Sequence, residues 1–169
     1  VNCSFGSYDL SEFDPDGIIY NAIKEFNGLV VCAAGNDGTN NDNTPHYPSN
    51  YNLDNIISVA NTDNSDVLIT KSNYGEASVD LAAPGVDIYT TNISEDSAYY
   101  YDVFSGTSAS APFVSGVAAL IKSIYPTMTA NGVKKAILDG VDTCSSLSGK
   151  VKTGGRLNAY KAIKSAQEH

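Results

Sequence analysis

Short apolar runs alternate along the chain with longer stretches in which apolar residues recur every three or four positions. The runs are continuous rather than alternating, which is typical of strands buried on both faces of a parallel sheet. The periodic stretches predict amphipathic helices that cover such a sheet. The expected strands span residues 1–5, 29–34, 56–60 and 79–83, and the expected helices span residues 15–26, 108–125, 130–138 and 157–166.

This alternation predicts an α/β fold of three layers, with a mainly parallel sheet flanked by helices. Asp14 is the expected N-cap of the first helix, with Pro15 at the first helical position. Polar stretches at residues 35–52 and 92–102 are too long for simple connectors, and we expect them to be functional or disordered loops.

Composition narrows the classes of function. The chain has 169 residues, enough for one domain, with 10 basic and 19 acidic residues and a net charge of −9. An acidic surface of this kind excludes nucleic acid as the expected partner. No apolar run reaches the roughly 18 residues that a membrane span needs. The first residues, VNCSFGSYD, lack the features of a signal peptide and are expected to begin inside a strand.

The cysteines do not form a metal-binding pattern. Cys3, Cys32 and Cys144 are few and widely spaced. Cys3 and Cys32 fall in apolar runs, where a free thiol behaves as a small buried hydrophobic group. A disulfide or a reactive thiol is the alternative, so cysteine usage leaves the cellular compartment open.

Two residues suggest chemistry. Ser108 lies where a loop becomes a helix, and backbone N–H groups at a helix N-terminus stabilise negative charge. Asn36 follows a buried strand and small residues that allow close approach. Acyl transfer needs a nucleophile and donors placed about 2.7–3.1 Å from the developing oxyanion. Taken singly, a serine in this position is more often a helix cap, and an asparagine in such a loop is more often a turn residue.

Several motifs together resemble the subtilisin-like serine proteases, the subtilase family. SGTSASAPFVSGVAAL resembles the family's signature around its nucleophile, with a departure at Ala111, and VVCAAGNDG resembles the strand and turn that carry its oxyanion asparagine. Three further segments, YPSNYNLDNIISV, VDLAAPGVDI and GGRLNAYKAI, follow in the family's order. The resemblance covers nearly all of residues 1–165.

The resemblance implies roles for particular residues. Ser108 takes the place of the nucleophile and Asn36 that of the oxyanion donor. The Tyr47-Pro48 bond is expected to be cis, as in the family's pocket loop. His46 stands where the family usually has a small residue at the floor of the primary pocket, which leaves the substrate preference open. The two walls of that pocket correspond to Ser4, Phe5 and Gly6 on one side and to Ala33, Ala34 and Gly35 on the other.

The resemblance implies no required cofactor. Asp80 resembles an acid that helps to bind a calcium or monovalent cation in some subtilases, with backbone oxygens near Ser49 and Tyr51. A solvated acid at a strand end is the alternative.

The nucleophile lacks an evident base. A serine at neutral pH needs an adjacent base, in this family a histidine oriented by an aspartate, and both precede the segment that resembles VNCSFG. The only histidines are His46 and His169, and neither lies in the family's histidine motif. Residues 1–169 are therefore expected to be the C-terminal part of a single peptidase domain, inactive without the upstream half.

The expected partners are a polypeptide substrate and either the missing half or a second copy, bound through the open edge of the strand at residues 1–5. Family resemblance implies a secreted or cell-surface location. A non-catalytic binding or scaffold protein with the same fold is the alternative. An α/β-hydrolase is disfavoured because its G-x-S-x-G motif is absent around Ser108.

Overall fold

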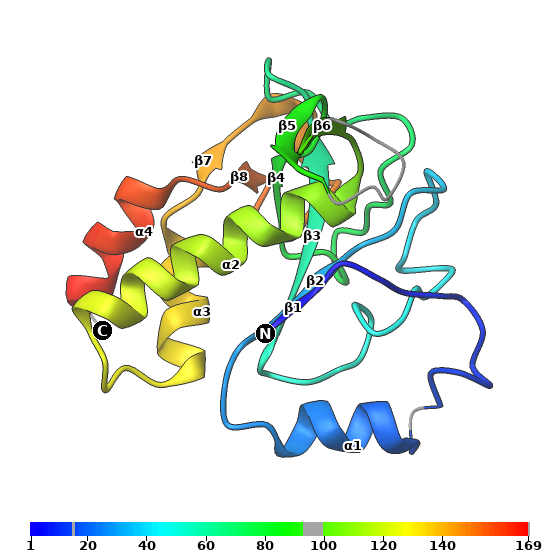
Figure 1. The fold of residues 1–169 in the computed structure, drawn as a ribbon, viewed down its shortest axis with the longest axis horizontal. Helices are drawn as coiled ribbons and strands as arrows, with labels where there is room; N and C mark the ends of the chain where they lie inside the picture. The colour runs from blue at the N-terminus through cyan, green and yellow to red at the C-terminus, as the bar shows by residue number, and fades with distance from the viewer. Residues whose placement is uncertain (15, 93–99, 169) are drawn as a thin grey trace.

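A six-stranded sheet runs through the computed structural model, which describes residues 1–14, 16–92 and 100–168 (Figure 1). The strand order is β1-β2-β3-β4-β8-β7, parallel except for the β7–β8 pair. β1 therefore lies at one edge. The strands are β1 (Asn2–Cys3), β2 (Val30–Ala33), β3 (Ile56–Thr62), β4 (Leu81–Pro84), β7 (Asp142–Thr143) and β8 (Gly155–Arg156).

Helices cover both faces of the sheet. They are α1 (Ile18–Glu25), α2 (Thr107–Ile124), α3 (Ala130–Asp139) and α4 (Ala159–Ser165), with 3₁₀ turns η1 (Ser145–Leu147) and η2 (Ala166–Glu168). Residues of α2, α3 and α4 pack with Ile57 and Val59 on one face of β3. On the other face, Ile23 of α1 packs with Val30, Cys32 and Ile56. Adjacent residues of a strand thus serve opposite layers, and the predicted three-layer α/β fold is confirmed.

The first helix begins later than predicted. Its N-cap is Gly17, and Pro15 lies outside the described residues. Asp14 is not the cap, because its carboxylate accepts a hydrogen bond from the N–H of Asp16 and its carbonyl accepts one from Gly17. The aspartate therefore closes a turn before the helix, a role that short polar side chains often take.

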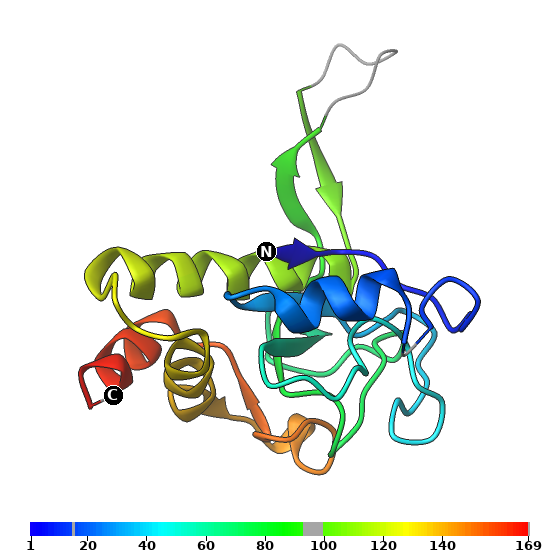
Figure 2. The ribbon, with the colours of Figure 1, turned by 90° about the horizontal axis from the view of Figure 1, so that it is seen from below.

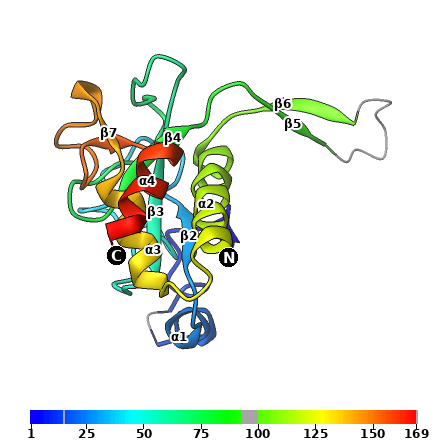
Figure 3. The same cartoon turned by 90° about the vertical axis from the view of Figure 1, so that its left-hand side faces the viewer.

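An antiparallel hairpin lies outside the main sheet and was not predicted. Strands β5 (Ile88–Thr91) and β6 (Tyr101–Phe104) project from the body of the molecule (Figures 2 and 3). The predicted loop at residues 92–102 overlaps this hairpin, and residues 93–99 of that loop lie outside the described residues. The rings of Tyr89 and Tyr101 stack with centroids 5.5 Å apart. Among the described helices, none is long and apolar enough to cross a membrane.

Candidate active site

A cavity of about 270 Å³ opens where β1 and β2 end and α2 begins. The ends of parallel strands are where sites usually form in α/β sheets. Segments from four parts of the chain meet there. The lining residues are Phe5, Gly6, Ala33, Gly35, Asn36, Asp37, His46, Thr107 and Ser108.

Ser108 lies in the first turn of α2, but it does not cap the helix. The N-cap is Gly106, whose φ of 138° is one that L side chains rarely adopt. The Ser108 hydroxyl instead donates a hydrogen bond to the carbonyl of Ser4, at 3.1 Å. The interpretation of Ser108 as a helix cap is therefore wrong, and its Oγ faces the cavity side of the helix.

A proline inside α2 leaves the Ser108 carbonyl to form a hydrogen bond with the segment that follows β1. Pro112 has no N–H, so the carbonyl of Ser108, four residues earlier, lacks its usual partner within the helix. The hydroxyl of Ser4 donates to that carbonyl at 2.8 Å. Together with the bond from the Ser108 hydroxyl, this makes a reciprocal pair that fixes the first turn of α2 against the end of β1.

Asn36 is oriented by Thr107. Its Oδ1 accepts hydrogen bonds from the Thr107 N–H at 2.8 Å and from the Thr107 hydroxyl at 3.1 Å. A backbone N–H can only donate, so this contact identifies the oxygen of the amide. The Nδ2 group is left to donate elsewhere. Thr107 is fully buried, and an asparagine held in this way is more than a turn residue.

Two glycines bring the cavity walls close to their neighbours. A Cβ added to Gly35, whose φ is +111°, would lie 2.3 Å from Nδ2 of Asn73. A Cβ added to Gly6 would lie 2.3 Å from Cε1 of His46. The His46 ring also approaches Gly35, with Cδ2 3.2 Å from the position of its added Cβ. The imidazole thus spans the space between the two walls.

His46 closes the floor of the cavity. It is 6% exposed, and its Nδ1 has no hydrogen-bond partner among the described residues. Burial lowers the pKa of the imidazole, and the nearby carboxylate of Asp37 partly opposes that shift. The ring of Tyr8 packs edge-on against it, with centroids 5.0 Å apart. The Tyr47-Pro48 peptide bond next to His46 is cis, as predicted.

The predicted wall residues do not all face the cavity. Phe5, Gly6, Ala33 and Gly35 line it, together with His46, Asn36 and Ser108. Ala34 does not, because successive residues of a strand point to opposite faces, and it lies in a separate buried cluster. Ser4 acts through its bonds to Ser108 rather than as lining. Sequence reasoning missed Thr107 and Asp37, although both are direct neighbours of the predicted residues.

Asp80 lies in a second pocket with the residues expected to hold a cation. Ser49, Tyr51 and Asp80 line it, and so do Lys134 and Lys152. Burial raises the pKa of Asp80, while the two ammonium groups and a hydrogen bond from the Ser58 N–H act in the opposite direction. The described residues contain no group of three or more His, Cys, Asp or Glu side chains that could hold a metal.

Lys134 occupies part of that pocket with its own charge. Its ammonium donates a hydrogen bond to the carbonyl of Ile56. Positive charge is thus already supplied to the Asp80 pocket by the chain itself. The residues present do not fit a resident calcium ion, which favours several oxygen ligands free of competing cations.

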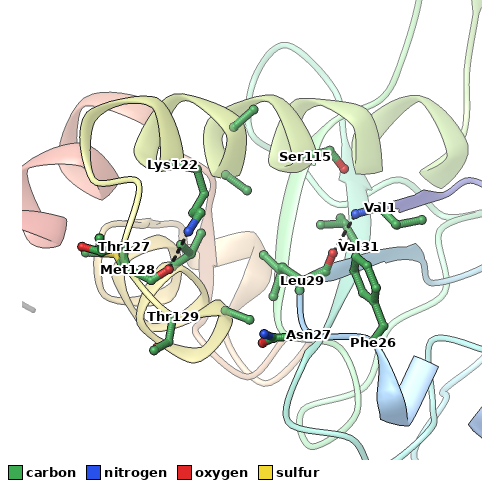
Figure 4. Close-up of a pocket in the computed structure, with 15 residues that line it drawn as sticks. Val1, Phe26, Asn27, Leu29, Val31, Ser115, Lys122, Thr127, Met128 and Thr129 are labelled. Atoms are coloured by element: carbon green, nitrogen blue, oxygen red, sulfur yellow. Dashed lines mark hydrogen bonds between the residues drawn. The ribbon is translucent and has the colours of Figure 1, made fainter. Parts of the chain in front are cut away.

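The largest of the cavities described for these residues lies away from Ser108 and Asn36. It measures about 470 Å³ and is mainly apolar (Figure 4). The ammonium of Val1, at its rim, donates to the Leu29 carbonyl at 2.7 Å. Phe26, Met128 and one side of α2 form much of its lining. Its size and lining indicate a surface for packing rather than for chemistry.

The fold and the cavity define a class of protein. A serine in the first turn of a helix and an oriented asparagine amide lie together in a cleft at the ends of parallel strands, which is the arrangement expected of the nucleophile and the oxyanion donor in a serine hydrolase. The family model described as the subtilase family of S8 peptidases matches residues 1–160. The chain belongs to the subtilase family, which confirms the resemblance seen in its motifs.

Individual relatives agree with this assignment. The chain is 41% identical over 135 residues to thermitase from Thermoactinomyces vulgaris, covering 80% of this chain and 44% of thermitase. It is 39% identical over 110 residues to subtilisin DY from Bacillus licheniformis, covering 64% of this chain and 38% of that protein. The chain thus spans less than half of the length of these relatives.

Solved structures show the same fold. The A-subunit of the AB5 toxin from E. coli has a TM-score of 0.79 at 30% identity, covering 98% of this chain and 59% of the toxin subunit. The prenylagaramide maturation protease PagA has a TM-score of 0.78 at 26% identity, covering 98% of this chain and 60% of PagA.

Proposed function

We propose that this chain supplies the nucleophile and the oxyanion donor of a subtilisin-like serine endopeptidase. The Ser108 oxygen would attack the peptide carbonyl, forming an acyl-enzyme as the amine leaves, and water would then release the acyl group. The Nδ2 group of Asn36 would donate to the carbonyl oxygen as it gains negative charge. The observation that carries this proposal is the Thr107–Asn36 contact. It holds the amide oxygen of Asn36 and so leaves the Nδ2 group available as a donor.

The proton of Ser108 must pass to a base, and the part of the chain that the structure describes places none at its hydroxyl. The Ser108 hydroxyl donates to a backbone carbonyl, which is not a base at neutral pH. His46 shares the cavity, but its ring is held between Gly6 and Gly35. His169 lies outside the described residues. We therefore infer that a histidine and its aspartate come from a further polypeptide segment, and that residues 1–169 form the C-terminal part of one peptidase domain.

An apolar face of α2 supports this inference. The inward side of the helix is buried, as expected for a helix on a sheet. The outward side is also apolar, with Phe113 at 43%, Leu120 at 50% and Ile124 at 50% exposure. Exposed apolar residues that gather along one side of a helix often mark an interaction surface. We define the docking face as this outward row of α2: Phe113, Gly116, Ala119, Leu120 and Ile124.

The docking face continues into the largest cavity and towards the open edge of the sheet. Ala119 belongs both to the docking face and to the cavity lining, and Val1 lies at the cavity rim (Figure 4). Among the described residues β1 pairs with β2 alone, so its other side offers backbone groups that no described strand pairs with. A segment that adds a strand to β1 would pair with these backbone groups, and if it also covered α2 it would bury the docking face. Self-association through the same surfaces is the expected state of the chain alone.

The substrate is proposed to be a polypeptide bound in the cleft beside Ser108. Its backbone would lie along the Ser4–Gly6 segment, and one side chain would enter the cavity above His46. We infer that no bound metal is needed at Asp80, since Lys134 and Lys152 already neutralise its pocket. A metal chelator should leave the midpoint of thermal unfolding unchanged, and a fall in that midpoint would contradict this inference. A secreted or cell-surface location is proposed from family membership alone.

The proposal is tested by supplying the base in trans. The purified chain is mixed with the N-terminal part of a subtilase catalytic domain that carries the Asp and His motifs, and cleavage of a fluorogenic peptide is measured. Activity should appear only in the mixture and should vanish with Ser108→Ala. A fluorophosphonate probe should label Ser108 in the mixture and not in the chain alone.

Two outcomes would contradict the proposal. Hydrolysis by the chain alone that depends on Ser108 would mean that the base lies within residues 1–169, and His46→Gln would then show whether His46 is that base. Tight association with the added segment, without labelling of Ser108, would favour the non-catalytic binding protein.

A further inference from the structure

Two thiols outside the proposed mechanism face each other across the first two strands. Cys3 of β1 and Cys32 of β2 are register partners in the parallel ladder. Neighbouring strands lie about 4.7–4.9 Å apart, which falls within the Cα separation of roughly 4.4–6.8 Å that disulfides adopt. Both side chains belong to the same buried cluster, on the face covered by α1. The pair is therefore placed for a bond that the structure does not contain, since both thiols are free.

The two thiols differ in their chemistry. The hydrogen bond from the Cys32 thiol lowers the pKa of Cys3 to about 7, and the same interaction with Cys3, together with burial, raises the pKa of Cys32 well above its ordinary value. A thiolate is the attacking species in disulfide exchange, and a neighbouring thiol can then resolve the mixed disulfide. Cys3 thus has the properties of the attacking thiol and Cys32 those of the resolving thiol.

Each cysteine directly precedes one wall of the cleft. Cys3 is followed by Ser4, which is bonded to Ser108, and then by Phe5 and Gly6. Cys32 is followed by Ala33 and then, at the end of the strand, by Gly35. A covalent bond between the two cysteines would therefore join the two walls immediately below the cavity.

We propose that Cys3 and Cys32 form a redox modification site, in which a low-molecular-weight disulfide oxidises the pair to an intramolecular disulfide that ties the two cleft walls together. The Cys3 thiolate attacks the small disulfide, forming a mixed disulfide and releasing one small thiolate. Cys32 then loses its proton and attacks the Cys3 sulfur, releasing the second thiolate. In sum, two protein thiols and one small disulfide give one protein disulfide and two small thiols.

Access to the pair comes through β1. Cys3 is 6% exposed and Cys32 is fully buried, so the attacking thiol is the less buried one. β1 has two residues and lies at the sheet edge, and short edge elements open at a lower free energy than the core does. Cys144 lies apart from the pair, at the end of β7, where its thiol donates to the Asp142 carbonyl.

The experiment uses the purified chain and glutathione disulfide under native conditions. After alkylation of the remaining thiols, the intact mass should show that two hydrogen atoms have been lost and that a single cysteine has been alkylated. A peptide map should link the Cys3 and Cys32 peptides, and a reducing agent should reverse the change. Because the bond closes a loop of about 30 residues, the midpoint of thermal unfolding should rise by about 5–15 °C. Amide exchange at Gly6 and Gly35 should slow.

Matched variants separate the two cysteines from the third. Cys144→Ser should respond as the unmodified chain does. Cys32→Ser should stop at a glutathione adduct on Cys3, and Cys3→Ser should not react at Cys32. A stable glutathione adduct on the unmodified chain, a bond to Cys144, or two thiols that stay reduced while Cys144 reacts would each overturn the proposal. None of these measurements depends on peptide hydrolysis, and the unmodified chain alone gives the deciding result, so failure of a variant to fold would not affect it.

Discussion

The cleft and the docking face differ in one respect: polar groups in the cleft are hydrogen-bonded within the chain, whereas apolar side chains on the docking face are left exposed. In the cleft, Asn36, Ser108 and Ser4 find partners within the chain, through the start of α2 and the end of β1. On the outward side of α2, Leu120 and Ile124 are half exposed, although they are as apolar as the buried side of the same helix. One helix thus carries polar side chains that are hydrogen-bonded within the chain at its first turn and an apolar surface that is not covered.

This contrast separates two requirements for activity. The positions of Ser108 and Asn36, the proposed nucleophile and oxyanion donor, are fixed by contacts between residues of this chain. Under the proposed function, burial of the docking face and supply of the base depend on a further segment. Changes in the cleft should therefore affect chemistry, whereas changes on the docking face should affect assembly.

The largest effect is expected from a charge on the docking face. Leu120→Lys should reduce activity in the reconstituted mixture by about 100-fold or more, because an unpaired charge buried at an interface costs several kcal/mol. The matched control is Tyr160→Lys, at an exposed residue of α4 outside the docking face. Titration of activity against the added segment measures the effect. Equal losses for the two variants would show that the outward side of α2 is not the docking surface.

A comparable loss in chemistry rather than assembly is expected from Asn36→Ala. The turnover number of the reconstituted enzyme should fall by about 10²–10³-fold, the loss known for removal of this donor in subtilisin. Thr107→Val removes only one of the two contacts to Oδ1 and should cost about 10-fold. Association with the added segment should be unchanged in both variants. An unaltered turnover number for Asn36→Ala would remove the amide from the mechanism.

A smaller, selective effect is expected at the cavity floor. His46→Gly removes the ring that spans Gly6 and Gly35, so the pocket should accept larger side chains. The ratio of kcat/KM for a peptide with phenylalanine before the cleaved bond to that with alanine should rise by about 10-fold or more, in the range of 1–3 kcal/mol typical of pocket contacts. A constant ratio would mean that the substrate side chain does not enter this cavity.

The smallest effect concerns pH. Burial lowers the pKa of His46 in the folded chain, so the unfolded chain binds more protons as the pH falls below the ordinary value of 6.5. The free energy of unfolding should therefore decrease between pH 7 and pH 5.5, by at most about 1.4 kcal/mol per pH unit. Urea unfolding of the unmodified chain and of His46→Gln measures this. The decrease should be smaller in the variant, and equal slopes would assign it to other groups.

The sequence predicted most of the core. Continuous apolar runs located β2, β3 and β4, because strands buried on both faces carry such runs. The spacing of apolar residues located α2 and α3 within two residues. Short strands such as β7 and β8 carry no pattern of their own, and they form only because β4 offers an edge to pair with.

The site was predictable in its residue types but not in its orientation. Motifs indicated Ser108 and Asn36, yet the contact that orients Asn36 depends on the position of Thr107, which spacing along the chain does not reveal. Ala34 was expected in the cavity wall but lies in a separate buried cluster. An unbroken apolar run does not show which face of the strand each residue occupies. Lys134 and Lys152 in the Asp80 pocket come from distant segments, so no local sequence pattern predicts that they lie beside Asp80.

Because Pro112 lacks an N–H for the Ser108 carbonyl, the surroundings of Ser108 depend on whether β1 is folded. In an ordinary helix the Ser108 carbonyl would be held by its own helix and would sense little beyond it. Here it is held by Ser4, so fraying of the two-residue edge strand releases one end of α2 as well. During gradual unfolding, the surroundings of Ser108 should thus change together with β1 and ahead of the helices behind it, so that loss of the site precedes loss of the fold.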